Sequence, residues 1–195
     1  MARPRTTSDE AILQATARAI SRHGPNGLTL GAVAKEAGLA PATLVQRFGS
    51  KRGLMLALAE RAPDGTRAVF ARARTAAHES PTEALIDALV ALAVGVSTPL
   101  EMANNLAFLQ LDLTDPEFRA HAAAQASTFR QETAALLDAA VFAGELRDVM
   151  DTARTARTLQ VVFNGTLLLW AVDGEGDPLA LLRAEVEDAL RRFRT

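Results

Sequence analysis

Hydrophobic residues recur along the chain at the three- and four-residue spacing of an α-helix, and no segment shows the alternation of a β-strand. The first stripe predicts a helix whose buried face holds Ile12, Ala15, Thr16, Ala19 and Ile20. Thr7 and Glu10 have the spacing of a capping box, so Thr7 is the predicted N-cap, and Gly24-Pro25 ends the helix. Ala, Leu, Arg and Glu are frequent while Val and Ile are sparse. The pattern therefore predicts an all-α fold.

Two short helices are predicted next. Thr29 can cap the first of them, and Gly38 stops it. Its buried face holds Leu30, Val33, Ala34 and Ala37. Pro41 suits the first turn of the second, where its missing N–H costs nothing, and Gly49 ends this helix after Phe48.

Breakers also divide the rest of the chain. Ser50 is expected to cap a fourth helix that ends at Pro63-Asp64-Gly65. Further helices are expected at residues 65–78, 81–96, 99–113, 116–143, 152–172 and 177–193. The prediction is thus an all-α chain of about nine to ten helices.

The charge is unevenly distributed along the chain. The net charge of the 195 residues is −2, yet residues 1–52 carry eight Lys and Arg against three acids, or +5, which leaves −7 for the remainder. A basic head on an acidic body suggests that the head alone contacts a polyanion, although a solvated charged surface can have the same composition. The chain has no cysteine, which excludes disulfides, thiolate metal sites and cysteine nucleophiles.

Residues 30–48 have the proportions of a helix-turn-helix, two short helices joined by the tight turn Gly38-Leu39-Ala40. The apolar positions are used by the core, which leaves Thr43, Gln46 and Arg47 pointing outward from the second helix. Gln can pair with the edge of adenine, Arg with guanine, and Thr with a phosphate or a thymine methyl. Ala42 leaves room for a close approach to the DNA backbone. The alternative is an ordinary helical hairpin with a solvated polar face.

Two cations, Lys51 and Arg52, follow Ser50 at the start of the fourth helix, where the helix dipole disfavours positive charge. A DNA phosphate bound there would reverse that cost. Arg3 and Arg5 precede the first helix and could reach the backbone or the minor groove, with simple disorder as the alternative.

Residues 29–51, TLGAVAKEAGLAPATLVQRFGSK, resemble the DNA-binding signature of the TetR family of bacterial repressors, and the resemblance extends over about residues 8–58. It implies DNA contacts by Thr29, Ala42, Thr43, Gln46, Arg47 and Lys51. The family usually has Ser where this chain has Ala40, Gly at Ala42, and aromatic residues at Val45 and Arg47. The operator sequence of other members therefore does not transfer to this chain.

The resemblance further implies a three-helix head, residues 1–55, and a helical ligand-binding and dimerisation body, residues 56–195. The apolar pattern agrees, because residues 158–172 are too hydrophobic to face water, and the last helix adds Leu182, Val186 and Leu190. Pairing of these two helices with their symmetry mates would give a dimer, and the alternative is an intramolecular core.

A ligand pocket is expected where polar residues interrupt apolar helices. Met102, Asn105, Phe108 and Leu109 share one side of a predicted helix, and Gln125 and Phe129 could face them from the long helix. Each amide could equally be a satisfied core residue. A small, mostly apolar effector is the corresponding hypothesis.

Enzymatic function has little support. One group of residues has the types that bind metals, namely Asp112, Asp115, Glu117 and His121. However, Asp115-Pro116-Glu117 is better explained as the start of a helix. The sequence has no phosphate-binding loop, nucleophile elbow or HExxH motif, so no cofactor, metal or catalytic residue is predicted. No secretory signal is present, and the apolar stretch at residues 159–172 is too short to span a membrane, so a cytoplasmic protein is expected.

The sequence therefore predicts a homodimeric, ligand-responsive transcriptional repressor that binds a palindromic double-stranded DNA operator. The alternative is a helical small-molecule-binding or interaction module without operator-specific DNA binding.

Overall fold

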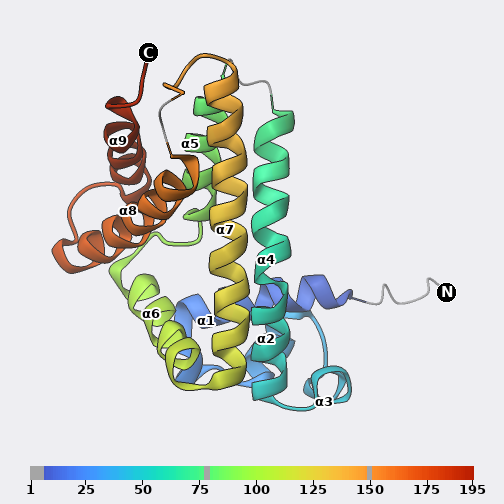
Figure 1. Cartoon of the computed structure of the whole chain (residues 1–195). Helices are drawn as coiled ribbons and strands as arrows, with labels where there is room; N and C mark the ends of the chain where they lie inside the picture. Colours follow the sequence, from blue (N-terminus) through green and yellow to red (C-terminus); the bar gives the residue numbers. More distant parts are fainter. Residues whose placement is uncertain (1–6, 77–79, 149–150) are drawn as a thin grey trace. The chain divides into compact units, whose positions relative to one another are not determined.

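The computed structural model describes residues 7–76, 80–148 and 151–195. Within these residues the chain is helical, and the sole extended pairing is an isolated bridge between Leu146 and Arg194 (Figure 1). The helices are α1 (Asp9–Gly27), α2 (Leu30–Ala37), α3 (Pro41–Phe48), α4 (Lys51–Thr75), α5 (Pro81–Leu92), α6 (Pro99–Thr114), α7 (Pro116–Phe142), α8 (Thr152–Asp173) and α9 (Pro178–Arg191). The all-α prediction is confirmed. None of these helices is both long and apolar enough to cross a bilayer.

Helix α1 differs from the prediction at its start and agrees with it near its end. The N-cap is Ser8, whose side chain accepts a hydrogen bond from the backbone N–H of Ala11, so the predicted cap at Thr7 is wrong by one residue. Both hydroxyls suit the role, and Asp9 and Glu10 then fall in the first turn, where the dipole favours acids. Gly24, at φ 67° and ψ 167°, interrupts the helical backbone where Gly24-Pro25 was expected to end it.

Helix α4 is continuous where a break was predicted. Pro63 lies inside it and is buried, so the expected end at Pro63-Asp64-Gly65 is wrong. The missing proline N–H removes one hydrogen bond, which costs about 3 kcal/mol in an isolated helix. Packing outweighs that cost, because Leu54 and Met55 before the proline and Phe70 after it are buried in hydrophobic cores.

The chain divides into two compact units. The first contains the described part of Met1–Arg61 together with Ala103–Ala122, and the second contains Ala62–Met102 and Ala123–Thr195. The grouping of Ala103–Ala122 with the N-terminal helices was not anticipated from sequence. The functional boundary between residues 55 and 56 stays a prediction.

The first unit is built on a core shared by α1, α2, α3 and the start of α4. Ile12, Val33, Leu44 and Leu54 are completely buried in it. Phe118 joins this core and meets Phe108 edge to face, with ring centroids 5.8 Å apart. In the same unit the Asn104 side-chain amide donates to the Ser21 carbonyl at 2.7 Å. The unit therefore presents α2 and α3 on a packed base.

The second unit is organised around α9, which packs against both α8 and α5. Leu182, Val186 and Leu190 of α9 are completely buried, as the apolar pattern required. Arg183 on the same helix pairs with Asp87 and lies 3.6 Å from Glu83, both on α5. Hydrophobic burial and this ion cluster thus hold α9 in place.

Gly53→Ala is expected to destabilise the fold. A Cβ at Gly53 would lie 2.1 Å from the Phe48 carbonyl oxygen, so the start of α4 would have to move away from the end of α3. We expect a loss of about 2 kcal/mol in the free energy of unfolding, measured by urea denaturation. Gly31→Ala is the control, because its Cβ would meet only Thr29 Oγ1 at 3.9 Å, and it should stabilise α2 by about 0.5–1 kcal/mol. Equal stabilities of the two variants would contradict the close approach.

Candidate nucleic-acid interface

The turn between α2 and α3 depends on Gly38. Its backbone is left-handed, at φ 68° and ψ 34°, a conformation that residues with a Cβ adopt at a cost. The Gly38 N–H donates to the last carbonyls of α2, and the Leu39 N–H donates to the Ala34 carbonyl at 2.8 Å. This hydrogen-bonding closes α2 and turns the chain sharply into α3, as predicted for a helix-turn-helix.

Helix α3 is anchored on one side and exposed on the others. Leu44 is its one fully buried residue, and it shares a core with Val33 and Ala34 of α2. Ala40 provides no side-chain cap, and Pro41 begins the helix instead. Phe48 at the end of the helix is half-buried against the same core, and the remaining side of α3 is exposed.

The free surface of α3 carries the predicted DNA-contacting residues. Ala42, Val45 and Gln46 are exposed, while Thr43 is half-buried. Thr29, the N-cap of α2, is exposed as well, with its Oγ1 accepting from the Ala32 N–H at 3.1 Å. The outward placement predicted for Gln46 agrees with the structure.

Arg47 is not free, although it lies on the same helix. Its Nη2 is 2.5 Å from Asp9 Oδ1, and its Nη1 donates to the Thr7 carbonyl at 2.6 Å. These contacts leave the Arg47 side chain 26% exposed. Arg47 as a whole residue is exposed, as predicted, although its guanidinium is paired with Asp9 and Thr7. Its contact with guanine stays a prediction.

The start of α4 holds the second predicted contact. Ser50 Oγ accepts from the Gly53 N–H at 3.0 Å and so caps this helix, as predicted. The Lys51 ammonium donates to the Asn26 carbonyl at 3.1 Å and has no carboxylate partner among the described residues. Its charge is therefore available to a phosphate.

Arg52, the neighbouring cation, is paired within the first unit. Its guanidinium donates to Asp115 and Glu117, both at 2.8 Å, and lies 5.5 Å above the Phe118 ring. The hydrogen bond from Arg52 holds the pKa of Asp115 below its usual value, and the same contact raises the pKa of Arg52. These contacts offset the unfavourable position of Arg52 in the first turn of α4.

Other cations of the basic head are neutralised locally. Glu36 of α2 accepts from Arg18 at 2.6 Å and from Arg22 at 3.3 Å, both on α1. The predicted contacts of Arg3 and Arg5 lie outside the described residues. Among the described cations of the first 52 residues, Lys35 and Lys51 are the two without a carboxylate partner.

The predicted ligand-binding residues are divided between the two units. In the first unit, Asn105 and Phe108 are half-buried and Leu109 is exposed. The Phe108 ring packs against the Phe118 ring. In the second unit, Met102 and Phe129 belong to the hydrophobic core and Gln125 donates to Thr66 Oγ1 at 2.7 Å. The Oε1 atom of Gln125 is buried without a hydrogen-bond partner. A common role of the six residues stays a prediction.

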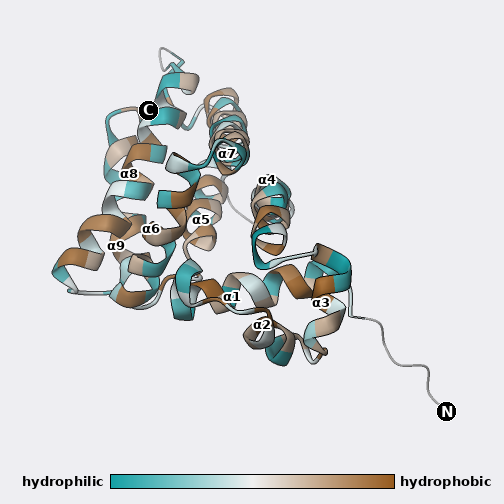
Figure 2. Ribbon diagram, turned by 90° about the horizontal axis from the view of Figure 1, so that it is seen from below, coloured by the Kyte–Doolittle hydropathy of each residue, from teal (hydrophilic) through white to brown (hydrophobic). Residues whose placement is uncertain are grey.

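Exposed apolar residues remain on α8 and α9 of the second unit. Figure 2 shows hydrophobic positions, in brown, along both helices. Val161, Leu168, Leu169 and Val172 repeat at helical spacing, so they lie on one face of α8, and each is at least 42% exposed. A hollow of about 750 Å³ lies beside this stripe, and Leu169 is the one stripe residue that lines it, together with Trp170 of α8 and Leu181 of α9, among others. Leu181 is itself exposed.

Two acidic residues near the α6–α7 turn, Asp112 and Asp115, have different relations to the helices. Asp115 caps α7 by accepting from the Glu117 N–H at 2.9 Å, as the sequence predicted. Asp112 is half-buried in the last turn of α6, where the dipole opposes negative charge. Burial raises the pKa of Asp112 to about 6, and the charge of His121 offsets part of this rise. No group of three or more potential metal ligands occurs in the described part of the chain.

The comparisons with known proteins converge on one class. Residues 12–58 match the sequence profile of "Bacterial regulatory proteins, tetR family", whereas no curated protein sequence matches the chain. PfmR, a TetR family transcriptional regulator from Thermus thermophilus, is similar with 25% identity, 92% of this chain and 97% of that chain covered, and a TM-score of 0.65. A TetR transcription regulator from Haloarcula marismortui gives a TM-score of 0.72 at 21% identity, with 96% and 98% covered. FadR from Bacillus subtilis, in complex with stearoyl-CoA, gives 0.67 at 19% identity, with 94% and 98% covered.

The fold and the exposed helix-turn-helix define a DNA-binding transcriptional regulator. Its helix-turn-helix region belongs to the tetR family of bacterial regulatory proteins, and the chain has the fold of TetR-family regulators. The resemblance identified from residues 29–51 is confirmed.

Asp112→Asn is expected to change how stability depends on pH. The pKa of Asp112 is higher in the folded than in the unfolded chain, so the folded state binds more protons between about pH 4 and 6. Its contribution to stability is thus lost as the pH rises through this window. At pH 8 the Asn variant should be more stable by about 1 kcal/mol, a value reduced for partial solvent exposure, and near pH 4 the two proteins should be alike.

Thermal unfolding between pH 4 and 8 measures this effect. Asp138→Asn, at an exposed position of α7, is the control for removing one negative charge. A constant difference between wild type and Asp112→Asn over the whole pH range would contradict the assignment.

Proposed function

We propose that the protein is a homodimeric transcriptional repressor that binds a palindromic operator and is released from it by a small, mostly apolar effector. The observation that carries this proposal is the helix-turn-helix of α2 and α3. It exposes Ala42, Val45 and Gln46 on α3 and is followed by Lys51, a cation with no carboxylate partner among the described residues.

Base recognition is assigned mainly to Gln46. An exposed glutamine in the major groove can pair through two hydrogen bonds with the N6 and N7 atoms of adenine. Thr43 is assigned a contact with a phosphate or a thymine methyl, and the small side chain of Ala42 would permit a close approach of the helix. These contacts distinguish sequences because they are made to base edges.

Backbone contacts are assigned to Lys51 and Thr29, and to Arg5 in the N-terminal arm. A lysine at a phosphate contributes affinity for any sequence and makes binding weaken with salt, because bound counterions are released. This division of roles separates affinity from specificity and can be tested residue by residue.

The dimer is proposed to form through α8 and α9. The exposed stripe of Val161, Leu168, Leu169 and Val172 would be costly in water, and a two-fold axis would bury the same stripe of both copies. Two helix-turn-helix units would then read two half-sites separated by about one turn of DNA, roughly 34 Å. A short α3 gains its specificity from this duplication.

The effector is proposed to bind the helical body. FadR has the same fold and was solved in complex with stearoyl-CoA, which supports a ligand-binding body here. Met102, Asn105, Phe108, Leu109, Gln125 and Phe129 remain the candidate contacts. Release from the operator requires the effector to favour the non-binding conformation by several kcal/mol.

Selection of DNA from a random pool by the purified protein, at about physiological salt, tests the function directly. An enriched inverted repeat is the expected result. Enrichment of nothing above background would contradict operator binding and favour a helical small-molecule-binding or interaction module.

Lys51→Gln should weaken binding to all sequences by about tenfold and lower the slope of log affinity against log salt by about 1. Arg72→Gln removes a positive charge from an exposed position near the other end of α4 and is the control. Gln46→Ala should instead relax the preference at one base position of each half-site. Fluorescence anisotropy with the selected operator and with scrambled DNA measures both effects. The same loss for Arg72→Gln as for Lys51→Gln would contradict the assignment of Lys51.

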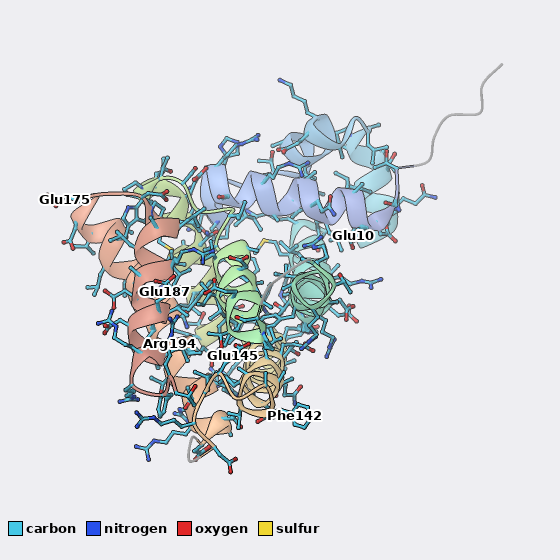
Figure 3. The ribbon with its side chains drawn as sticks, turned by 90° about the horizontal axis from the view of Figure 1, so that it is seen from above. Glu10, Phe142, Glu145, Glu175, Glu187 and Arg194 are labelled. Atoms are coloured by element: carbon cyan, nitrogen blue, oxygen red, sulfur yellow. The ribbon has the colours of Figure 1, made fainter. Side chains whose placement is uncertain are left out.

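Leu169→Glu should convert the dimer to a monomer, because it places a charge in the middle of the apolar stripe, where Leu169 is 64% exposed in the single chain. Sedimentation velocity measures the change. Phe142→Glu is the matched control, since Phe142 is 95% exposed and belongs to α7 (Figure 3). A dimer that survives Leu169→Glu and dissociates with Phe142→Glu would move the interface away from α8.

A further inference from the structure

The strongest feature that the proposed function leaves unexplained is the pairing of Arg47 on the candidate DNA-reading helix. Its two terminal nitrogens are both occupied, one by the Asp9 carboxylate at 2.5 Å and the other by the Thr7 carbonyl at 2.6 Å. Both partners lie at the beginning of α1. The guanidinium is therefore engaged by groups of the protein, although Arg47 and its neighbour Gln46 are both exposed residues.

The position of Asp9 suits a carboxylate. It lies in the first turn of α1, where the unpaired backbone N–H groups and the helix dipole favour an anion. A carboxylate is also the best geometric partner for the planar guanidinium fork. Asp9 therefore competes with DNA for Arg47.

The competition matters because Arg is the side chain that most often reads guanine, through its O6 and N7 atoms. An Arg47 held by Asp9 has both terminal nitrogens engaged and makes no such contact. The neighbouring Glu10 has no part in this pairing, since it accepts from Gln14 of its own helix at 3.2 Å (Figure 3).

We propose that Asp9 is a specificity-determining residue that restrains Arg47, so that this arginine does not read the DNA bases in the wild-type protein. The proposal rests on the proposed function, because it concerns which side chains of α3 face the operator. Base preference then comes from Gln46 and Thr43, and removal of the Asp9 charge adds a guanine preference that the wild type lacks.

The experiment uses four variants of the full chain: Asp9→Asn, Glu10→Gln, Arg47→Ala and the double variant Asp9→Asn/Arg47→Ala. Glu10→Gln removes the same charge from the same turn of α1 without touching Arg47, so it measures the general electrostatic effect on DNA affinity. DNA selection and anisotropy titration are carried out on each variant and on the wild type, with thermal unfolding as a check that each is folded.

Asp9→Asn is expected to bind DNA about two- to fivefold more tightly than Glu10→Gln, a range typical of a surface ion pair, and to enrich guanine at one position of each half-site. The double variant should lose both gains. Arg47→Ala alone should select the same motif as the wild type, because Arg47 reads no base there.

Three results would overturn the inference. Asp9→Asn and Glu10→Gln could share the same affinity and motif, the gain could persist in the double variant, or Arg47→Ala alone could lose a guanine preference of the wild type. The last result stands even if Asp9→Asn fails to fold. If the wild type selects a DNA motif and one of these results is found, the role of Asp9 is refuted and the proposed function stands. If the wild type selects no DNA, the proposed function is refuted as well.

Discussion

Burial of Leu44 is the constraint on which the head depends. Helix α3 has eight residues, and this leucine is the one that the core covers completely. Its position relative to α2 is set by the left-handed turn at Gly38 and by the small residue Ala34, which admits it to the core. On the C-terminal side, the absence of a side chain at Gly53 lets α4 begin against the Phe48 carbonyl. Most residues of α3 are therefore exposed, as entry of a helix into the major groove requires.

Electrostatics in the head is governed by pairing more than by net charge. The first 52 residues carry +5, yet Arg18, Arg22, Arg47 and Arg52 each have an acidic partner within the first unit. The partners Asp115 and Glu117 come from beyond residue 52, so a count over the N-terminal segment overstates the charge offered to DNA. Among the described residues, the cation next to α3 that has no carboxylate partner is Lys51.

Helix starts could be predicted well because their signals are local. Pro81, Pro99, Pro116 and Pro178 each open a helix, and the hydroxyl or carboxylate caps before them follow from neighbouring residues. Pro63 is the same residue type with the opposite outcome, since burial on both sides of it keeps α4 continuous. Local sequence carries no information on that packing.

The candidate site was predictable to the same extent. Periodicity alone placed Gln46 outward and Leu44 inward, whereas the pairing of Arg47 with Asp9 and of Arg52 with Asp115 joins residues far apart in the chain. Likewise, side chains that share one face of α6, such as Met102 and Phe108, enter different hydrophobic cores. Which cluster a residue joins is decided by the tertiary fold.

The proline within α4 also has a mechanical consequence. Because Pro63 has no N–H, the carbonyl four residues earlier accepts no backbone hydrogen bond from it. Helix α4 therefore lacks one i to i−4 hydrogen bond near its middle. Backbone hydrogen bonds make a helix stiff, and bending is least costly where one of them is missing. Helix α4 is therefore easiest to bend near Pro63, at a position that the covalent structure of the chain determines.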